Sequence, residues 1–577
     1  MLPPPATESL SRLAKPSNPF TKSITRWFGL GCIVVFVLWV AGPYVGSIGW
    51  VPAEVDYYPP LSQNTNTSQE STQVDNELIW DARKEEVREA FKHAWAGYKN
   101  RAMPNDELLA VSGGYSNKYN GWGVTLFDSL DTMWIMGLRK EFDEAVESIK
   151  DLHFRPTKPN HYAPFFETTI RYLGGILSAY ALSGNEVLFR LADEMGQLLI
   201  PAFDGTESGL PAYSVHVETG TVLADAGKTT VLFSEATSCQ LEFKYLSKIT
   251  GKKEYYERVQ AAMDVFYRAN VPDGLFHENW SFKDGKPTGS HFTIGANADS
   301  GYEYMIKQWL QSGDVKAKDQ YLKSMNGIIN NLIYVTPNRG LMYVGDMDHG
   351  SMVHRLEHLS CYLPGVLALG AHVLPRNDPS FPDDVRELHQ WAAHGLAYTC
   401  AVSYLDQKNG MGADILHMSS SGRLWINELN KWKREGRVGK PPGVTDPPAE
   451  RDPGKRDYFN NFPNAYLLRP ETVESIFVLW RTTGDVQWRE RGYAIFKAIN
   501  EHTRTEYGFS PIHGVDGSIT HLDDMPSWFL AETLKYLYLL FDDVHSITSD
   551  HWVFNTEAHP LPIFEWTEAE KKAFTIP

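Results

Sequence analysis

Cysteine is scarce in this chain of 577 residues, which has only Cys32, Cys239, Cys361 and Cys400. Four such dispersed cysteines exclude a small domain built on a disulfide framework. No two of them are close in sequence, so a zinc ribbon is excluded as well. Apolar residues make up 42% and charged residues 22% of the chain, which is the composition of a globular protein with a core.

Basic charge is also in short supply, because 54 Lys and Arg face 71 Asp and Glu and leave a net charge of −17. A protein that binds nucleic acid needs a basic surface for the phosphates, so we expect no nucleic-acid partner. Aromatic residues are plentiful, with 17 Trp, 28 Tyr and 28 Phe. They suit an aromatic core and also a cleft that binds sugars, and composition does not separate the two.

The N-terminus contains a long apolar run without a charged residue, residues 27–51. About 20 apolar residues cross a bilayer as a helix, so we predict a transmembrane anchor here. Four basic residues precede the run, and Glu54 and Asp56 follow it, so the positive-inside rule places residues 1–26 in the cytosol and the remainder in the lumen. A cleaved signal peptide is the alternative, and either interpretation places most of the chain in an oxidising compartment.

Two segments lack the pattern of a packed core. Residues 52–78 are rich in Ser, Thr, Asn and Gln without apolar periodicity, so we predict a luminal stem. Residues 434–457 are rich in Pro, Gly and charge and are predicted to be a surface loop whose basic residues are solvated. Asn66 and Asn279 begin glycosylation acceptor patterns, which also occur by chance.

From about Leu78 onward, apolar residues recur at three- and four-residue steps, as in ETTIRYLGGILSAYALSG. Several units repeat the order of an apolar helix, a glycine stop and a more charged helix, and their glycines are Gly184, Gly251, Gly313 and Gly484. Repeated helix pairs form an open solenoid or a closed ring, and first helices that are apolar on nearly all sides favour the ring. We therefore predict an all-α barrel over residues 79–562, with small β-hairpins at one rim and a C-terminal tail at 563–577.

One or two acidic residues precede each glycine stop by about one helix length. They are Glu167, Glu235, Asp299 with Glu303, and Glu471 with Glu474. The helix dipole stabilises an acid at a helix N-terminus, which explains any single one of them. These acids have apolar and aromatic neighbours, however, and a buried carboxylate is costly without a partner or a function. If the first helices run parallel round a ring, the acids converge at one end, where they could bind a hard cation and cleave a glycosidic bond.

Several blocks of the sequence resemble, in the same order, the class I α1,2-mannosidases of glycoside hydrolase family 47. They are GGYSNKYNGWGVTLFDSLDTMWIMGL, FFETTIRYLGGILSAYALSG, ADSGYEYMIKQWLQSGD, HLSCYLPGVLALG, LLRPETVESIFVLWRTTGD, AETLKYLYLLF and VFNTEAHP, within residues 113–560. The resemblance implies an (αα)7 barrel that removes terminal α1,2-linked mannose from oligomannose N-glycans with inversion and depends on Ca²⁺. It also implies a type II membrane protein of the endoplasmic reticulum or Golgi, whose luminal domain we expect to be monomeric.

The resemblance also assigns catalytic roles. Glu167 resembles the general acid, acting through a water molecule. Asp299 and Glu471 resemble the pair that handles the attacking water, with one of the two as the base. Two carboxylates that act through a water predict inversion at the anomeric carbon and a gap between them of about 6.5–9.5 Å.

Thr556, in VFNTEAHP, resembles the one direct protein ligand of Ca²⁺. A threonine can offer its backbone carbonyl and its hydroxyl oxygen to a hard cation. Waters and two sugar hydroxyls would complete the metal shell. The acids expected to hold those waters are Glu474, Glu532 and Glu557.

Six residues match substrate-binding positions of the family: Arg171, Asn297, Glu357, His358, Asp414 and Glu474. On spacing alone, Arg171 is also a salt-bridge partner for Glu167. Asn297 stands where family members carry Arg or Leu, a position that governs which mannose branch is accepted, and a broader, Golgi-like preference is expected. Glu357 replaces a family Asp, Asp414 replaces a family Glu, and Pro526 replaces another Glu; the first two swaps move the carboxylate oxygens by about one methylene.

Cys361 and Cys400 match the disulfide pair of the family. Two reduced core thiols are the alternative, although an oxidising lumen favours the bond. Cys239 is expected to stay free and buried.

A second hypothesis uses the same pocket without catalysis, as a mannose-binding lectin or a factor of endoplasmic-reticulum degradation. The substitutions at Glu357, Asp414 and Pro526 motivate it. A third hypothesis, a prenyltransferase or cyclase built on an α/α toroid, needs a zinc site or a DDxxD cluster. Asp523-Asp524 lacks the third acid of such a cluster.

Overall fold

The computed structural model describes residues 69–223, 229–269, 271–544 and 546–576. The predicted cytosolic tail, the apolar run at 27–51 and the Asn66 acceptor pattern lie outside these residues. Within them, no helix combines the length and the apolar character that a membrane span requires. The predicted stem differs from the structure at its C-terminal end, because helix α2 (Gln69–Arg101) already begins at Gln69. Once a helix is nucleated, each added residue gains one hydrogen bond, so a helix can extend into polar residues, which an argument from apolar spacing does not detect.

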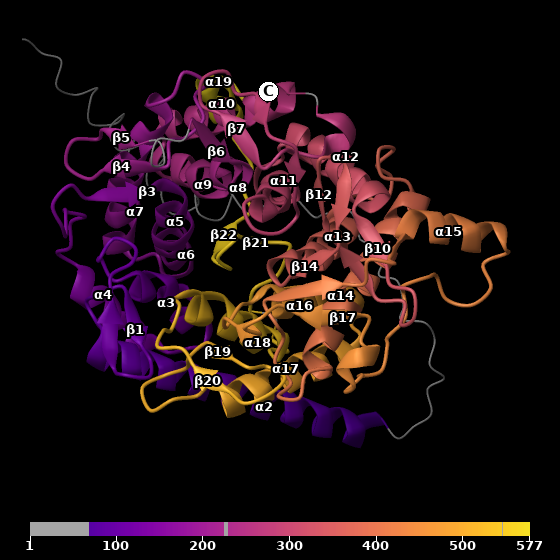
Figure 1. Cartoon of the computed structure of the whole chain (residues 1–577). Coiled ribbons are helices and arrows are strands. Elements are labelled where there is room, and N and C mark those ends of the chain that lie inside the picture. Colours follow the sequence, from indigo (N-terminus) through magenta and orange to yellow (C-terminus); the bar gives the residue numbers. More distant parts are fainter. Residues whose placement is uncertain (1–68, 224–228, 270, 545, 577) are drawn as a thin grey trace, which may run out of the picture. The chain divides into compact units, whose positions relative to one another are not determined.

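Seven helices within residues 69–576 pack side by side in a closed ring, visible around the centre of Figure 1. Each contacts the next in chain order, and the π-helical turn η7 (Phe529–Thr533) before the last helix contacts the first. These inner helices are α3 (Val124–Ile135), α6 (Gly174–Ser183), α9 (Gln240–Thr250), α11 (Asp299–Ser312), α13 (Leu363–Val373), α16 (Glu471–Thr483) and α18 (Leu534–Leu540).

An outer helix packs against each inner helix. Six of them directly follow their inner helix in the chain, and α2, from the N-terminal end of the described residues, packs against α18. The six are α4 (Arg139–Ile149), α7 (Glu186–Leu199), α10 (Lys253–Arg268), α12 (Val315–Asn331), α14 (Asp383–Leu405) and α17 (Val486–His502). Burial follows this arrangement: α6 is buried on every side over residues 174–179, whereas α7 buries one face.

The predicted glycine stops end four of the inner helices. Gly184, Gly251, Gly313 and Gly484 have φ of 68°, 70°, 77° and 68°, and each donates its N–H to the carbonyl four residues earlier. A residue with a Cβ pays a steric cost in this left-handed conformation, so glycine ends the helix and lets the chain turn into the outer helix.

Small antiparallel sheets, predicted as hairpins at a rim, connect the helical pairs. Several strands, such as β3, β6 and β14, are followed by a short helical turn and then by an inner helix, so these sheets gather where the inner helices begin. Six of the sheets are β3 (Tyr162–Pro164), β4 (Ser214–His216) and β5 (Val222–Leu223); β6 (Thr230–Leu232), β7 (Asn279–Ser281) and β8 (Pro287–Thr288); β9 (His291–Phe292), β12 (Asp346–Asp348) and β13 (Ser351–Val353); β10 (Ile333–Val335), β11 (Met342–Val344) and β16 (Arg423–Leu424); β14 (Arg355–Glu357), β15 (Ile415–Met418) and β17 (Tyr458–Asn460); and β18 (Ala465–Tyr466), β19 (Ile512–His513) and β20 (Thr520–His521). A two-stranded pair, β1 (Glu107–Leu109) and β2 (Gly114–Ser116), follows α2.

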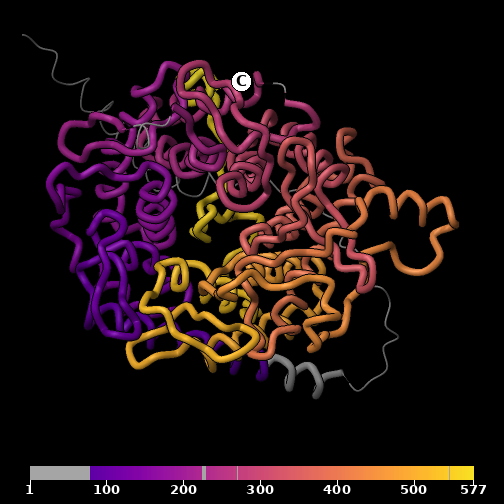
Figure 2. The backbone as a smooth tube through the Cα atoms, viewed as in Figure 1, coloured from indigo at the N-terminus to yellow at the C-terminus, as the bar shows by residue number. Residues whose placement is uncertain are grey.

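A last hairpin lies inside the ring. Strands β21 (Trp552–Phe554) and β22 (Pro560–Pro562) pair antiparallel and occupy the centre of Figure 1. They contact α11, α6 and α9, three inner helices. Figure 2 shows the same C-terminal segment, in yellow, passing from the centre of the ring to its edge.

The segment predicted as a C-terminal tail contains a helix. Within 563–577, Phe574 of α19 (Glu568–Phe574) and Trp566, which precedes this helix, pack against Tyr256 of α10. The predicted surface loop 434–457 begins at the end of α15 (Trp425–Arg434), and most of its basic residues are exposed, as predicted. Arg456 is the exception within this loop, because it is buried. Arg456 donates to Asp516 at 2.8 Å and to a backbone carbonyl, a long-range pairing that sequence spacing does not reveal.

The predicted disulfide is confirmed: Cys361 and Cys400 are bonded, which ties the turn η5 (Leu359–Tyr362) before α13 to α14. Cys239 is free and buried, as predicted.

Candidate active site

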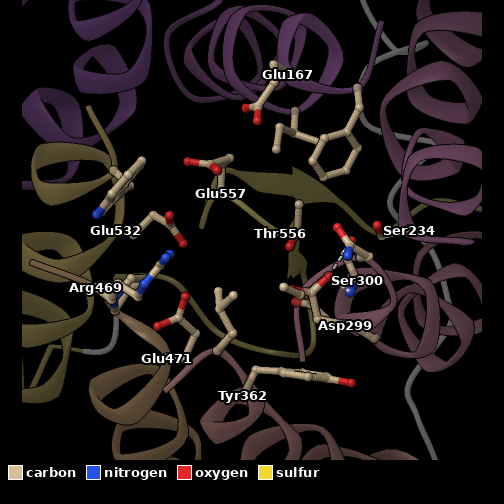
Figure 3. Close-up of a pocket in the computed structure, with 18 of the residues that line it drawn as sticks. Glu167, Ser234, Asp299, Ser300, Tyr362, Arg469, Glu471, Glu532, Thr556 and Glu557 are labelled. Atoms are coloured by element: carbon tan, nitrogen blue, oxygen red, sulfur yellow. Dashed lines mark hydrogen bonds between the residues drawn. The ribbon is translucent and has the colours of Figure 1, made fainter. Parts of the chain in front are cut away.

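A pocket with a volume of about 300 Å³ lies at the end of the ring where the inner helices begin. Acids from separate helices line it, as the repeat predicted, and Figure 3 shows their side chains around Thr556. The lining acids are Glu167, Glu235, Asp299, Glu303, Glu471, Glu474, Glu532 and Glu557. The convergence predicted from the spacing of acids and glycines is therefore present.

Glu167 ends the short helix α5 (Phe165–Glu167) and directs its carboxylate into the pocket from one side (Figure 3). Arg171, one turn later in the π-helical segment η1 (Thr168–Leu173), donates from Nε to Glu167 at 2.7 Å. Its Nη1 lies 2.7 Å from Glu557, and its guanidinium carbon lies 5.2 Å and 5.4 Å from the ring centres of Tyr119 and Trp528. Arg171 therefore fixes the orientation of two pocket carboxylates at once.

Asp299 is the first residue of α11 and is half-buried in the lining of the pocket. Its Oδ1 accepts the backbone N–H of Ser300 at 2.8 Å. Burial raises the pKa of Asp299 to about 7, since removal from water penalises the charged form more than that hydrogen bond stabilises it; the charges of Glu303 and Glu471 add to the rise.

Glu471 is the first residue of α16 and has a different environment. Burial pushes its pKa upward, but a hydrogen bond from His358 Nδ1 at 2.7 Å and the positive charges of His358 and Arg469 outweigh this and leave the pKa below its usual value. The pocket thus contains one carboxylate that ionises readily and another, Asp299, that holds its proton to near neutral pH.

Four of the remaining lining acids are Glu303, Glu474, Glu532 and Glu557. Burial raises the pKa of Glu474 and of Glu557 to about 8, and it raises the pKa of Glu532 well above its usual value. Repulsion from neighbouring carboxylates adds to each shift. Glu303 and Glu474 have Lys307 as a nearby cation, with its Nζ 3.9 Å from Glu474. So many buried acids with few compensating cations favour the binding of a positive ion.

Thr556 lies in the turn between β21 and β22 and reaches the centre of this group of acids (Figure 3). Its hydroxyl and carbonyl are oxygen donors of the kind that Ca²⁺ prefers, and the surrounding carboxylates are hard oxygen donors as well. Within the described residues, no three His, Cys, Asp or Glu side chains are close enough to hold a metal directly. The residues fit a cation that Thr556 contacts and that the acids reach through water.

The other predicted substrate-binding residues are placed differently. Asn297 lines the pocket, but its amide donates to Glu278 at 2.6 Å. His358 lies behind Glu471, buried and bonded to Tyr404 as well.

The two carboxylates of altered length also lie behind the lining of the pocket, and both have partners. Glu357 accepts the backbone N–H of Ala296 at 2.9 Å, and Asp414 accepts from Arg469 Nε at 2.6 Å. Pro526 is buried just before η7 and is not part of the lining. These positions therefore support the wall of the pocket.

Sequence reasoning missed several lining residues. Arg469 lines the pocket between Asp414 and Glu471. It stands two residues before Glu471 in the block LLRPETVESIF, so its closeness in sequence to a predicted catalytic acid could have identified it. Phe166, Ser234, Tyr362 and Trp528 also line the pocket. Phe166 and Ser234 directly precede the predicted acids Glu167 and Glu235, so the same proximity could have found them.

Comparisons with known proteins agree with this geometry. The profile of glycosyl hydrolase family 47 matches residues 90–563. The human endoplasmic reticulum mannosyl-oligosaccharide 1,2-alpha-mannosidase is 38% identical over 497 residues, covering 84% of this chain and 64% of the human protein, so the chain spans slightly less than two thirds of that relative. The mannosyl-oligosaccharide alpha-1,2-mannosidase IA of Drosophila melanogaster is 35% identical over 495 residues, covering 84% of this chain and 68% of that protein.

The solved structure of an alpha-1,2-mannosidase from Trichoderma reesei has the same helix-rich fold, with a TM-score of 0.73 at 27% identity. The match covers 84% of this chain and 99% of the fungal chain. The family profile spans most of the chain, and the two relatives are more than one third identical to it. The solved structure shares the fold. The chain belongs to glycosyl hydrolase family 47.

Proposed function

We propose that this protein is a mannosyl-oligosaccharide 1,2-α-mannosidase that hydrolyses terminal α1,2-linked mannose from oligomannose N-glycans with inversion. The observation that carries the proposal is one pocket into which Glu167, Asp299 and Glu471 point from separate helices, with Thr556 at its centre (Figure 3). The names of the human and Drosophila relatives support the substrate class.

The different pKa shifts of Asp299 and Glu471, together with the position of Glu167, suit different catalytic roles for these three carboxylates. Glu471 ionises readily, because His358 and Arg469 stabilise its negative charge, and it is the group suited to take a proton from the attacking water. Asp299 holds its proton to a pKa of about 7 and lines the same pocket, where it would orient that water. Glu167 faces them from the other side of the pocket, on the side where a general acid would protonate the leaving oxygen through a water.

Calcium is the proposed cofactor. Thr556 would bind it directly, and Glu474, Glu532 and Glu557 would hold its waters. The ion would supply a fixed positive charge that binds sugar hydroxyls and lowers the cost of so many buried carboxylates. Arg171 and Asn297 would contact the glycan. Three residues behind the pocket lining would act indirectly: His358 would hold Glu471, Glu357 would hold the backbone of Ala296, and Asp414 would hold Arg469.

We further propose that the seven helical pairs form an (αα)7 barrel that is a monomeric catalytic domain in the lumen of the endoplasmic reticulum or Golgi. The apolar run at 27–51 would anchor it as a single-pass type II membrane protein, with residues 1–26 in the cytosol. The disulfide between Cys361 and Cys400 supports an oxidising compartment.

The test is the release of free mannose from a nine-mannose N-glycan by the full-length protein in mild detergent. Calcium-dependent release, abolished by a chelator and restored by added Ca²⁺, is expected. The β-anomer should be the first product, which nuclear magnetic resonance detects before mutarotation. The Glu167→Gln variant is the matched control. Binding of the glycan without release, in the presence of calcium, would instead identify a lectin.

A further inference from the structure

Glu242 is a buried acid of the ring that none of the proposed catalytic steps uses. It lies on inner helix α9, is fully buried and does not line the pocket. Its Oε1 accepts two hydrogen bonds, from Tyr304 Oη at 2.7 Å and from Asn555 Nδ2 at 2.8 Å. Its Oε2 has no hydrogen-bond partner among the described residues. Tyr304 and Asn555 also accept hydrogen bonds from backbone N–H groups of the turn that carries Thr556.

Tyr304 makes the first of the two connections. It belongs to α11, and its hydroxyl oxygen accepts the backbone N–H of Thr556 at 3.2 Å while donating its own proton to Glu242. Because the hydroxyl proton of Tyr304 is donated to Glu242, the lone pairs of the hydroxyl oxygen face the backbone N–H of Thr556. Glu242 therefore sets the direction of the hydrogen bond that holds the backbone of Thr556.

Asn555 makes the second connection. Its Oδ1 accepts the backbone N–H groups of Glu557 at 2.9 Å and His559 at 2.8 Å, which closes the turn around Thr556. Its Nδ2 donates to Glu242 and to the backbone carbonyl of Ile170 at 3.0 Å. The amide of Asn555 is thereby oriented from outside the turn, by α9 and by the segment that precedes α6.

The turn is closely packed on both sides. A Cβ at Gly174, the first residue of α6, would lie 2.5 Å from Asn555 Nδ2, so the helix has room for Asn555 only because residue 174 has no side chain. On the other side of the turn, His559 binds Asp131 at 2.8 Å, and Lys535 binds the carbonyl of Ala558 at 2.7 Å. The turn is therefore held from several inner helices at once.

We propose that Glu242 is a positioning residue that, through Tyr304 and Asn555, fixes the oxygens of Thr556 at the point where the pocket receives its cation. The inference rests on the proposed function, in which Thr556 binds Ca²⁺ directly. Burial raises the pKa of Glu242 to about 7, so near neutral pH a large share of this carboxyl group is uncharged. A glutamine can therefore replace it in this role, because its carbonyl oxygen accepts the same two bonds.

The experiment measures Ca²⁺ binding directly, by isothermal titration calorimetry of the calcium-free full-length protein, without sugar. Glu242→Leu removes the acceptor of both bonds and is expected to weaken Ca²⁺ binding at least about tenfold, since two buried donors lose their acceptor. Glu242→Gln is expected to bind Ca²⁺ within about twofold of the unmodified protein, because the acceptor remains.

Lys244→Met is the matched control. Lys244 lies on the same helix, is equally buried, and binds Gln308 at 3.0 Å and Asp314 at 2.8 Å, away from the turn. This variant should lower the thermal midpoint of the calcium-free protein and leave the affinity for Ca²⁺ unchanged. Tyr304→Phe removes only the hydroxyl and serves if Glu242→Leu does not fold; it should weaken Ca²⁺ binding about threefold or more.

Unchanged affinity in Glu242→Leu or Tyr304→Phe would overturn the inference, as would an equal loss in Lys244→Met, which would trace the effect to general destabilisation. An unmodified protein that binds no Ca²⁺ would instead overturn the proposed cofactor itself. The titration of the unmodified protein therefore distinguishes a failure of this inference from a failure of the proposed function.

Discussion

The contact between His358 and Glu471 allows a quantitative test of the proposed base. His358 Nδ1 lies 2.7 Å from Glu471 Oε2, and the opposite ring nitrogen lies 2.6 Å from Tyr404 Oη. Both His358 and Glu471 are largely removed from solvent, so the hydrogen bond is not screened as a surface pair would be. The substitution His358→Leu removes the donor and its positive charge and leaves Arg469 in place.

The expected magnitude follows from the strength of this bond. A hydrogen bond to a charged group is worth about 1.5–3 kcal/mol, and one pKa unit corresponds to about 1.36 kcal/mol, so the pKa of Glu471 should rise by about 1–2 units. A base works only when ionised. Since the carboxylate of the variant holds its proton to a higher pH, activity should be lost on the acidic side, and the acidic limb of the profile should move upward by the same 1–2 units.

The assay is kcat/KM for mannose release, measured from acidic to mildly alkaline pH with saturating calcium. Tyr404→Phe is the control, because it removes the hydroxyl behind the imidazole and keeps the His358 bond to Glu471; its acidic limb should shift by less than about half a unit. An acidic limb that stays in place in His358→Leu, with a rate that falls equally at every pH, would refute the assignment of Glu471 as the base.

Three further predictions concern the acid, the disulfide and the buried charges below the pocket. Glu167→Gln should lower kcat by about 10²–10⁴-fold, the range for loss of a general acid, with Ca²⁺ affinity unchanged in calorimetry; a loss below tenfold would exclude that role. Replacing Cys361 and Cys400 together by serine opens a bond that spans 39 residues and should cost about 4 kcal/mol of unfolding free energy in urea; a cost below about 1 kcal/mol would contradict the chain-entropy argument. Lys535→Met leaves Asp131 buried without the cation 3.0 Å away and should destabilise the calcium-free protein by about 3–5 kcal/mol, whereas the double variant with Asp131→Leu should recover part of that loss.

Much of this fold could be predicted from the periodicity of its apolar residues, because each helical pair has a local sequence pattern. The glycines at the ends of the inner helices were visible in the sequence, and each has the left-handed backbone that only glycine adopts without strain. The convergence of Glu167, Asp299 and Glu471 followed from one assumption, that equivalent helices run parallel round a ring. The resemblance to the family added Thr556, for which neither spacing nor composition provided a reason.

The sequence by itself therefore determined the helical hairpins, their order and the acids at their starts, since these depend on residues within one turn of each other. Spacing also indicated the ion pair of Arg171 with Glu167, but only the tertiary structure decided which charges far apart in the chain meet. His358 lies against Glu471, 113 residues away in the chain, and Glu242 reaches Asn555 across 313 residues. Such contacts set which carboxylate ionises and where Thr556 stands. They depend on how the ring closes, which no local pattern encodes.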